Sequence, residues 1–146
     1  VRRKYNLEVG VHTAQEIKIM VGSAMYIAKP LSVEIKGRDL ITGLPRIVNV
    51  TSDDVTEALQ HDLNLLINAI KDVLHKTPPE LSADVMDKGI ILTGGSALLR
   101  NIDELITQAT GVPTYVADEP MFCSAKGTGI ALENIESYKR SILATK

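Results

Sequence analysis

The chain has 146 residues, of which 45% are apolar and 23% are charged, as is ordinary for a globular protein. Its formal net charge of −2 argues against a nucleic-acid-binding protein that depends on bulk positive charge. The single cysteine, Cys123, excludes an internal disulfide framework and is typical of a reducing compartment.

The opening residues and the apolar runs give expectations about the context of the chain. No apolar core follows Val1-Arg2-Arg3-Lys4, so we expect no signal peptide. No apolar run approaches the roughly 20 residues of a membrane-spanning helix. Because the first residues read as the middle of a helix, we expect the chain to be a piece of a longer protein.

The chain begins with two predicted helices. Residues 1–7 read as the end of a basic helix, and Thr13 with Glu16 forms the capping-box pattern of a second helix of about three turns. In that second helix Gln15 and Lys18 are three residues apart, so they project from one face. A solvated helix face is the simpler interpretation of this pair, and a binding function is the alternative.

A hairpin and a long helix follow. Alternating apolar residues at 32–36 and 45–51 predict two strands, and Thr42-Gly43 between them predicts a turn. Ser52-Asp53-Asp54 predicts the cap and first turn of the longest helix, where acidic side chains favour the positive helix end. This helix must end before Pro78-Pro79, because proline cannot continue it.

The second half of the chain is predicted to centre on a glycine turn. Residues 78–88 predict a linker, and the unbroken apolar run 90–92 predicts a strand covered on both faces. Gly94 and Gly95 predict a sharp turn, with Ser96 as the N-cap of the next helix. Such a junction presents backbone N–H groups at a positive helix end, where a nucleotide can sit. A tight turn that binds nothing is the other interpretation, and the pattern alone favours it.

A strand at 112–116 and a helical region at 120–143 complete a β-α-β-α order, which predicts parallel strands. Gly127 and Gly129 interrupt the last helix at a cost of roughly 1 kcal/mol each, so we expect close packing or a ligand near them. We find no phosphate loop, no catalytic motif and no metal-site spacing. The residues alone therefore predict a two-lobed α/β chain with a candidate nucleoside site, and no catalytic or metal-binding residues.

Several segments together resemble the MreB/Mbl family of bacterial actin homologues, and the resemblance covers essentially the whole chain. The segments that carry it are 1–7, 36–40, 42–46, 77–84, 89–99 and 126–129. The resemblance implies the α/β fold of the actin-like (ribonuclease H-like) ATPases, of which the chain is the C-terminal portion, a partial second domain. Residues 1–76 then form the upper subdomain of helices and a β-hairpin. Residues 77–146 form the C-terminal part of the lower subdomain, with the order β-α-β-α.

The same resemblance implies where a nucleoside binds. The glycine turn matches the family's adenosine motif, and the second predicted helix matches its other nucleoside-contacting segment. The expected cofactor-binding residues are Gln15, Glu16, Lys18, Gly94, Gly95, Ser96 and Ala97. The family usually has glutamate at the position of Gln15 and often a third glycine at that of Ser96. An amide can still hydrogen-bond ribose hydroxyls, but it carries no charge.

The resemblance also implies a function. Members of the family bind ATP and polymerise into cytoplasmic filaments at the inner face of the cell membrane, where they maintain rod shape and guide peptidoglycan synthesis. The implied partners are other copies, the cell-wall elongation machinery and membrane-anchored morphogenesis proteins, but not nucleic acid. The implied membrane contact, phosphate loops, hydrolytic residues and Mg²⁺ site lie in regions absent from this chain, so we expect the chain alone not to hydrolyse ATP.

Two further expectations follow from the incomplete domain. Missing strands would leave an open sheet edge near Ile91 and Tyr115, which favours self-association. Two other functions stay open: another actin-fold ATPase, either a small-molecule kinase or a heat-shock chaperone, and an interaction module without a nucleotide.

Overall fold

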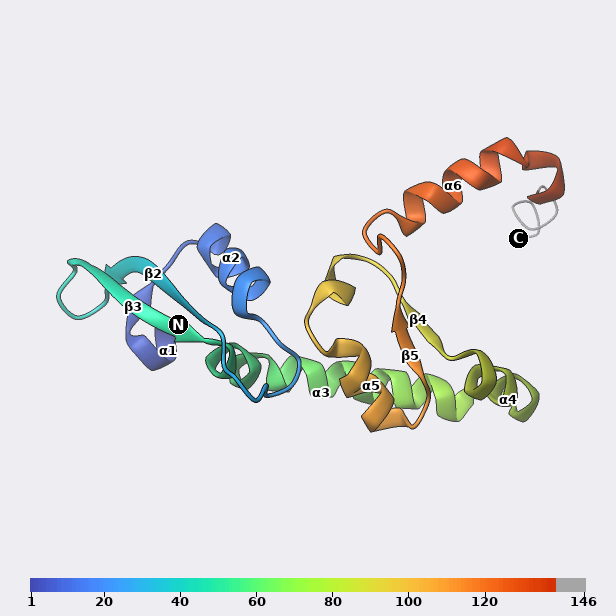
Figure 1. The fold of residues 1–146 in the computed structure, drawn as a ribbon, viewed down its shortest axis with the longest axis horizontal. Helices are drawn as coiled ribbons and strands as arrows, with labels where there is room; N and C mark the ends of the chain where they lie inside the picture. Colours follow the sequence, from blue (N-terminus) through green and yellow to red (C-terminus); the bar gives the residue numbers. More distant parts are fainter. Residues whose placement is uncertain (139–146) are drawn as a thin grey trace.

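The computed structural model of the chain describes residues 1–138, which form two lobes connected by one long helix (Figure 1). The helices are α1 Arg2–Tyr5, α2 Val11–Val21, α3 Ser52–Lys76, α4 Pro79–Lys88, α5 Ile102–Thr110 and α6 Cys123–Glu133, with a 3-10 helix, η1, at Gly95–Leu98. The strands are β1 Leu7–Glu8, β2 Ser32–Asp39, β3 Pro45–Thr51, β4 Ile90–Leu92 and β5 Thr114–Val116.

The first lobe is a three-stranded antiparallel sheet in the order β1-β2-β3, packed with α1 and α2. The predicted hairpin is confirmed, and β3 has the predicted bounds. The short strand β1 was not predicted, because two residues are too few for a periodic pattern. The buried side chains of this core are Leu7, Ile17, Val21, Ile35, Val48 and Val50.

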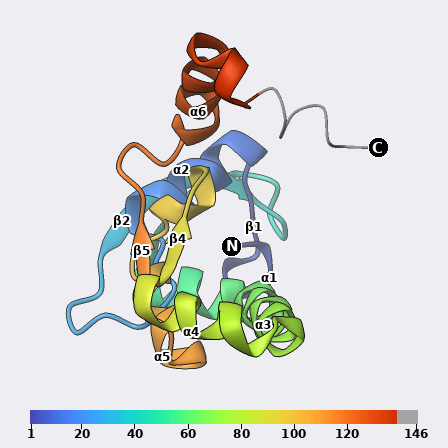
Figure 2. The same ribbon diagram turned by 90° about the vertical axis from the view of Figure 1, so that its right-hand side faces the viewer.

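The second lobe is built on the parallel pair β4 and β5, which α5 connects. The predicted β-α-β unit with parallel strands is therefore confirmed. The prediction that β4 is covered on both faces is wrong, because β5 is its only partner strand in residues 1–138 and Ile91 is 66% exposed. A second core, made by Ala24, Leu63, Ile102 and Ile106, joins α3 to α5. Both lobes thus lie on α3, as two views of the ribbon show (Figures 1 and 2).

Three predicted boundaries are wrong. The predicted linker 78–88 is the helix α4, because Pro79 occupies the first helical turn, where its missing N–H is harmless. Helix α2 begins after Gly10, whose carbonyl accepts the Ala14 N–H at 3.0 Å, so Thr13 lies inside the helix and does not cap it. Ser96 lies inside η1 and caps no helix.

Helix α6 begins at Cys123, and none of its residues is buried. In both ribbon views it extends away from the two lobes (Figures 1 and 2). A Cβ added at Gly127 or Gly129 would meet nothing within 4 Å in residues 1–138, so the expected close packing is not found there. The predicted extension of this helix to residue 143 runs past the described residues.

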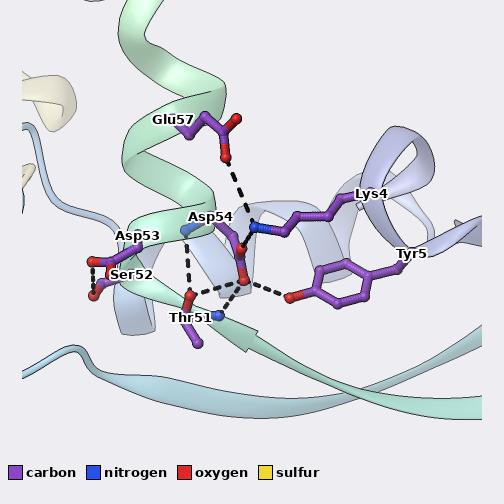
Figure 3. Close-up of polar contacts among 7 residues, drawn as sticks. All are labelled: Lys4, Tyr5, Thr51, Ser52, Asp53, Asp54 and Glu57. Atoms are coloured by element: carbon purple, nitrogen blue, oxygen red, sulfur yellow. Dashed lines mark hydrogen bonds and ion pairs between the residues drawn. The ribbon is translucent and has the colours of Figure 1, made fainter.

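A cluster of polar contacts around Asp54 fastens α1 to the start of α3 (Figure 3). The N-cap is Thr51, one residue before the predicted cap, and it forms a capping box with Asp54. The Thr51 N–H donates to Asp54 Oδ2 at 2.8 Å, and the Tyr5 hydroxyl donates to the same oxygen at 2.6 Å. Lys4 Nζ lies 2.5 Å from Asp54 Oδ1. The Asp54 carboxylate therefore connects α1, the end of β3 and the first turn of α3.

A second carboxylate, Asp39, holds the hairpin turn. Its Oδ1 accepts the N–H groups of Ile41 and Thr42, both at 2.9 Å. Its Oδ2 lies 2.8 Å from Arg46 Nη1 on the opposite strand. These bonds explain why the chain turns between β2 and β3.

We expect the protein to lose stability in acid because of these two carboxylates. The backbone N–H of Thr42 and the Arg46 guanidinium hold the pKa of Asp39 well below its usual range. Burial raises the pKa of Asp54, but the hydrogen bonds from Lys4, Tyr5 and Thr51 outweigh burial and lower it overall. Both groups favour the folded state while ionised.

This stabilisation is present above the unfolded pKa of about 4 and is lost as the pH falls below it. The midpoint of urea unfolding should therefore drop between about pH 5 and pH 3. An Asp39→Asn/Asp54→Asn double variant should show a smaller drop. Equal drops in the variant and the unchanged protein would contradict the assignment.

Candidate functional site

The two lobes enclose a groove of about 900 Å³ between α2 and η1, with α3 as its floor. Figure 1 shows α2 and the segment containing η1 on the same side of α3. Gln15 and Lys18 line the groove from α2, and Gly95, Ser96 and Ala97 line it from η1. Two segments about eighty residues apart in sequence, singled out separately, therefore face one cavity.

The other two predicted residues do not line the groove. Glu16 lies beside Gln15 on α2, but successive residues on a helix point in different directions, and its Oε1 lies 3.5 Å from His12 Nε2. The Gly94 N–H donates to the Pro120 carbonyl at 2.7 Å, so this donor is already used. Gly94 has φ +86°, which explains the glycine by backbone conformation alone.

Gly95 contributes open space to the groove. A Cβ built on it would meet nothing within 4 Å in residues 1–138, so packing inside the chain does not require glycine there. Its neighbour Ser96 is exposed and Ala97 is buried. At Gly95 the wall formed by η1 is thus bare main chain, which allows a flat ligand to approach the backbone closely there.

The groove combines an apolar floor with a polar rim. Leu59, Leu63 and Leu66 of α3 form part of the floor. Lys18 and Arg100 bring positive charge to its edges, and Gln15 an amide that can donate and accept hydrogen bonds. An apolar slot with few polar groups suits an aromatic ring that carries a hydroxyl-rich substituent.

The described residues offer no site for a catalytic metal. No cluster of three or more His, Cys, Asp or Glu side chains in residues 1–138 could hold a metal ion. Within the same residues no helix combines the length and apolar character needed to cross a membrane.

Most of the lining residues were not singled out as site residues from the sequence, and Arg100, Asp62 and Met121 are among them. Arg100 comes directly after the matched segment 89–99, and this position was the only available signal. Asp62 lies on the exposed side of the predicted long helix, where acids are common. Met121 lies in the groove lining next to Pro120, whose carbonyl accepts the Gly94 N–H, and no local pattern reveals that contact.

Comparison with known proteins decides the family. The family model described as "MreB/Mbl protein" matches residues 1–140. The chain belongs to the MreB/Mbl family. The cell shape-determining protein Mbl of Bacillus cereus is 48% identical over 98% of the chain. The cell shape-determining protein MreB of Escherichia coli is 42% identical over 94%. The membership of this family that the sequence resemblance implied is thus confirmed.

The actin-like fold is confirmed by solved structures of this family. A crystal structure of MreB5 of Spiroplasma citri bound to ADP has a TM-score of 0.88 to the chain, with 33% identity over 97% of its residues. The chain spans 43% of the Bacillus cereus relative, 40% of the Escherichia coli relative and 42% of the MreB5 chain. That this share is the second domain, divided near residue 76, stays a prediction.

Proposed function

We propose that the chain is the nucleoside-binding part of an ATP-binding MreB/Mbl protein that polymerises into filaments and maintains cell shape. The observation that carries the proposal is the single groove lined by Gln15, Lys18 and Gly95–Ala97. Two crystal structures of the related MreB5 contain ADP and AMPPNP, which supports an adenine nucleotide as the ligand.

The groove suggests how the nucleotide lies. Adenine packs on the apolar floor against the main chain at Gly95, where no Cβ narrows the space. The amide of Gln15 and the ammonium of Lys18 face the ribose hydroxyls. Because the chain has no phosphate loop, the phosphates and any bound Mg²⁺ contact other parts of the protein. The chain by itself is then an adenosine clamp without ATPase activity.

The remaining parts of the proposal concern the whole protein. We infer that it acts in the cytoplasm at the inner face of the membrane, as filaments that guide peptidoglycan synthesis. Its partners are then other copies, the elongation machinery and membrane-anchored morphogenesis proteins. The sheet of β4 and β5 has two strands in residues 1–138, and its unpaired backbone edges support association with further strands, either of the same protein or of another copy.

Filling the open space at Gly95 should test the groove directly. In the full-length protein, Gly95→Val should weaken ATP binding by about tenfold or more, because the new side chain occupies the volume of the ring. The dissociation constant is measured by isothermal titration calorimetry.

Gly10→Val is the matched control for this experiment. A Cβ at Gly10 also meets nothing within 4 Å, and Gly10 lies outside the groove lining. This variant should bind ATP with unchanged affinity. The proposal fails if the unchanged protein does not bind ATP, or if both variants bind it equally well.

A further inference from the structure

We infer that Arg100 is a positioning residue that fixes the gap between the two walls of the groove. The inference rests on the proposed function, since it concerns the same nucleoside site. Arg100 reaches from the η1 side of the groove to the end of α2, where its Nη1 donates to the Gly22 carbonyl at 3.1 Å. No residue pattern in the sequence links these two positions.

The main chain already brings the two walls together at this point. The Ala24 N–H donates to the Arg100 carbonyl at 2.8 Å, and Ser23 forms a parallel bridge with Arg100. Ser23, which is fully buried, also donates its hydroxyl to the Met25 carbonyl at 2.7 Å. The buried segment 22–24 is therefore held by main-chain contacts against residue 100, whose own side chain is exposed.

The side chain of Arg100 adds a charge-assisted bond at the end of a helix. The Gly22 N–H donates to the Lys18 carbonyl at 2.9 Å, so Gly22 ends α2. The last carbonyls of a helix have no partner inside it and carry partial negative charge. A guanidinium is a strong partner for such a carbonyl, because its charge is permanent and its donors are rigid.

The geometry connects this bond to both walls. Lys18 lies one helical turn before Gly22, and η1 ends two residues before Arg100. The bond from Arg100 to Gly22 therefore lies one turn from the proposed ribose contact and next to the proposed adenine contact. If it is removed, α2 and η1 remain folded, but the distance between them is held by fewer contacts.

Nucleoside binding to three forms of the full-length protein tests this role. Arg100→Met keeps the length of the side chain but removes its donors, and Arg100→Lys keeps one charged donor. Arg100→Met should weaken the binding of adenosine and the binding of ADP by the same factor, about tenfold. A loss of this size is the scale of one charge-assisted hydrogen bond. Arg100→Lys should restore affinity to within about threefold. Arg38→Met, on the exposed surface of β2, is the control and should change neither affinity.

Equal losses for adenosine and ADP separate positioning from direct phosphate contact. A loss for ADP alone would overturn the inference, because Arg100 would then act on the phosphates. Unchanged binding by Arg100→Met would also overturn it. If the unchanged protein binds neither ligand, the proposed function fails and the inference fails with it.

A distance measurement without ligand covers the case in which a variant binds poorly because it is less stable. Spin labels at Ala14→Cys on α2 and Leu98→Cys on η1, in a background without other cysteines, report the width of the groove. Arg100→Met should broaden the distance distribution, and Arg100→Lys should not. Identical distributions in all three proteins would overturn the inference.

Discussion

Replacing Asp54 with alanine should lower the free energy of unfolding by about 3 kcal/mol. Asp54 closes the capping box of α3 and also accepts hydrogen bonds from Tyr5 and Lys4 of α1 (Figure 3). Its side chain is only 9% exposed, so water replaces little of what is lost. The change removes a helix cap and leaves the Tyr5 hydroxyl and the Thr51 N–H without their partner. Urea unfolding followed by circular dichroism measures the effect.

Glu57→Ala is the matched control for this experiment. Glu57 lies on the same helix and faces the same lysine, with its Oε2 3.8 Å from Lys4 Nζ, but its side chain is 70% exposed. Exposed ion pairs of this kind contribute at most about 1 kcal/mol, so the control should change stability little. Similar losses in the two variants would show that the cluster acts only through surface charge, and that the capping box contributes nothing.

Local patterns predicted the elements whose causes are local. The hairpin strands alternate apolar and polar residues along one half-buried sheet, and the observed β3 has the predicted bounds. Helix α3 carries an acidic first turn and ends before Pro78-Pro79, and both features act within a few residues. Parallel pairing of β4 with β5 followed from chain order, because a crossover helix leaves little alternative.

Errors arose where one residue type has two physical meanings. Pro79 was interpreted as a helix breaker, but at the start of α4 the same ring favours the helix. Thr13 has the spacing of a cap, but the extended backbone at Gly10 starts α2 earlier. The apolar run of β4 predicts burial, but burial depends on which other strands are present, and the sequence of β4 contains no information about them.

The candidate site was predicted in part for the same reasons. The spacing of Gln15 and Lys18 on one helix face was a local observation, and both residues line the groove. Glu16 came from matching a continuous segment to a family motif, which ignores the direction in which each side chain points. That α2 and η1 face each other follows from long-range contacts such as that between Ser23 and Arg100, which no local pattern encodes.

A close backbone contact at the end of α2 predicts a large effect of substituting Gly22. An alanine Cβ there would lie 2.2 Å from the Lys18 carbonyl oxygen and 3.2 Å from Leu99 Cδ1. The backbone at Gly22 has φ −65° and ψ 137°, which alanine adopts easily, so the cost is purely steric. Because a backbone atom cannot move away cheaply, Gly22→Ala should lower the free energy of unfolding by about 3 kcal/mol. Urea unfolding measures this change.

Gly10→Ala, at the other end of the same helix, isolates the steric cause. Gly10 has a similar extended backbone, with φ −69° and ψ 161°, and a Cβ there meets nothing within 4 Å. Gly10→Ala should change the free energy of unfolding by less than about 1 kcal/mol. Alanine is a weaker N-cap than glycine, but it also makes the unfolded chain less flexible, and the two effects offset each other. Gly22→Ala also pushes the end of α2 away from Leu99, so it should widen the groove and weaken ATP binding, whereas Gly10→Ala should not. If Gly22→Ala were as stable as Gly10→Ala, the close contact between Gly22 and the Lys18 carbonyl at the end of α2 would be refuted.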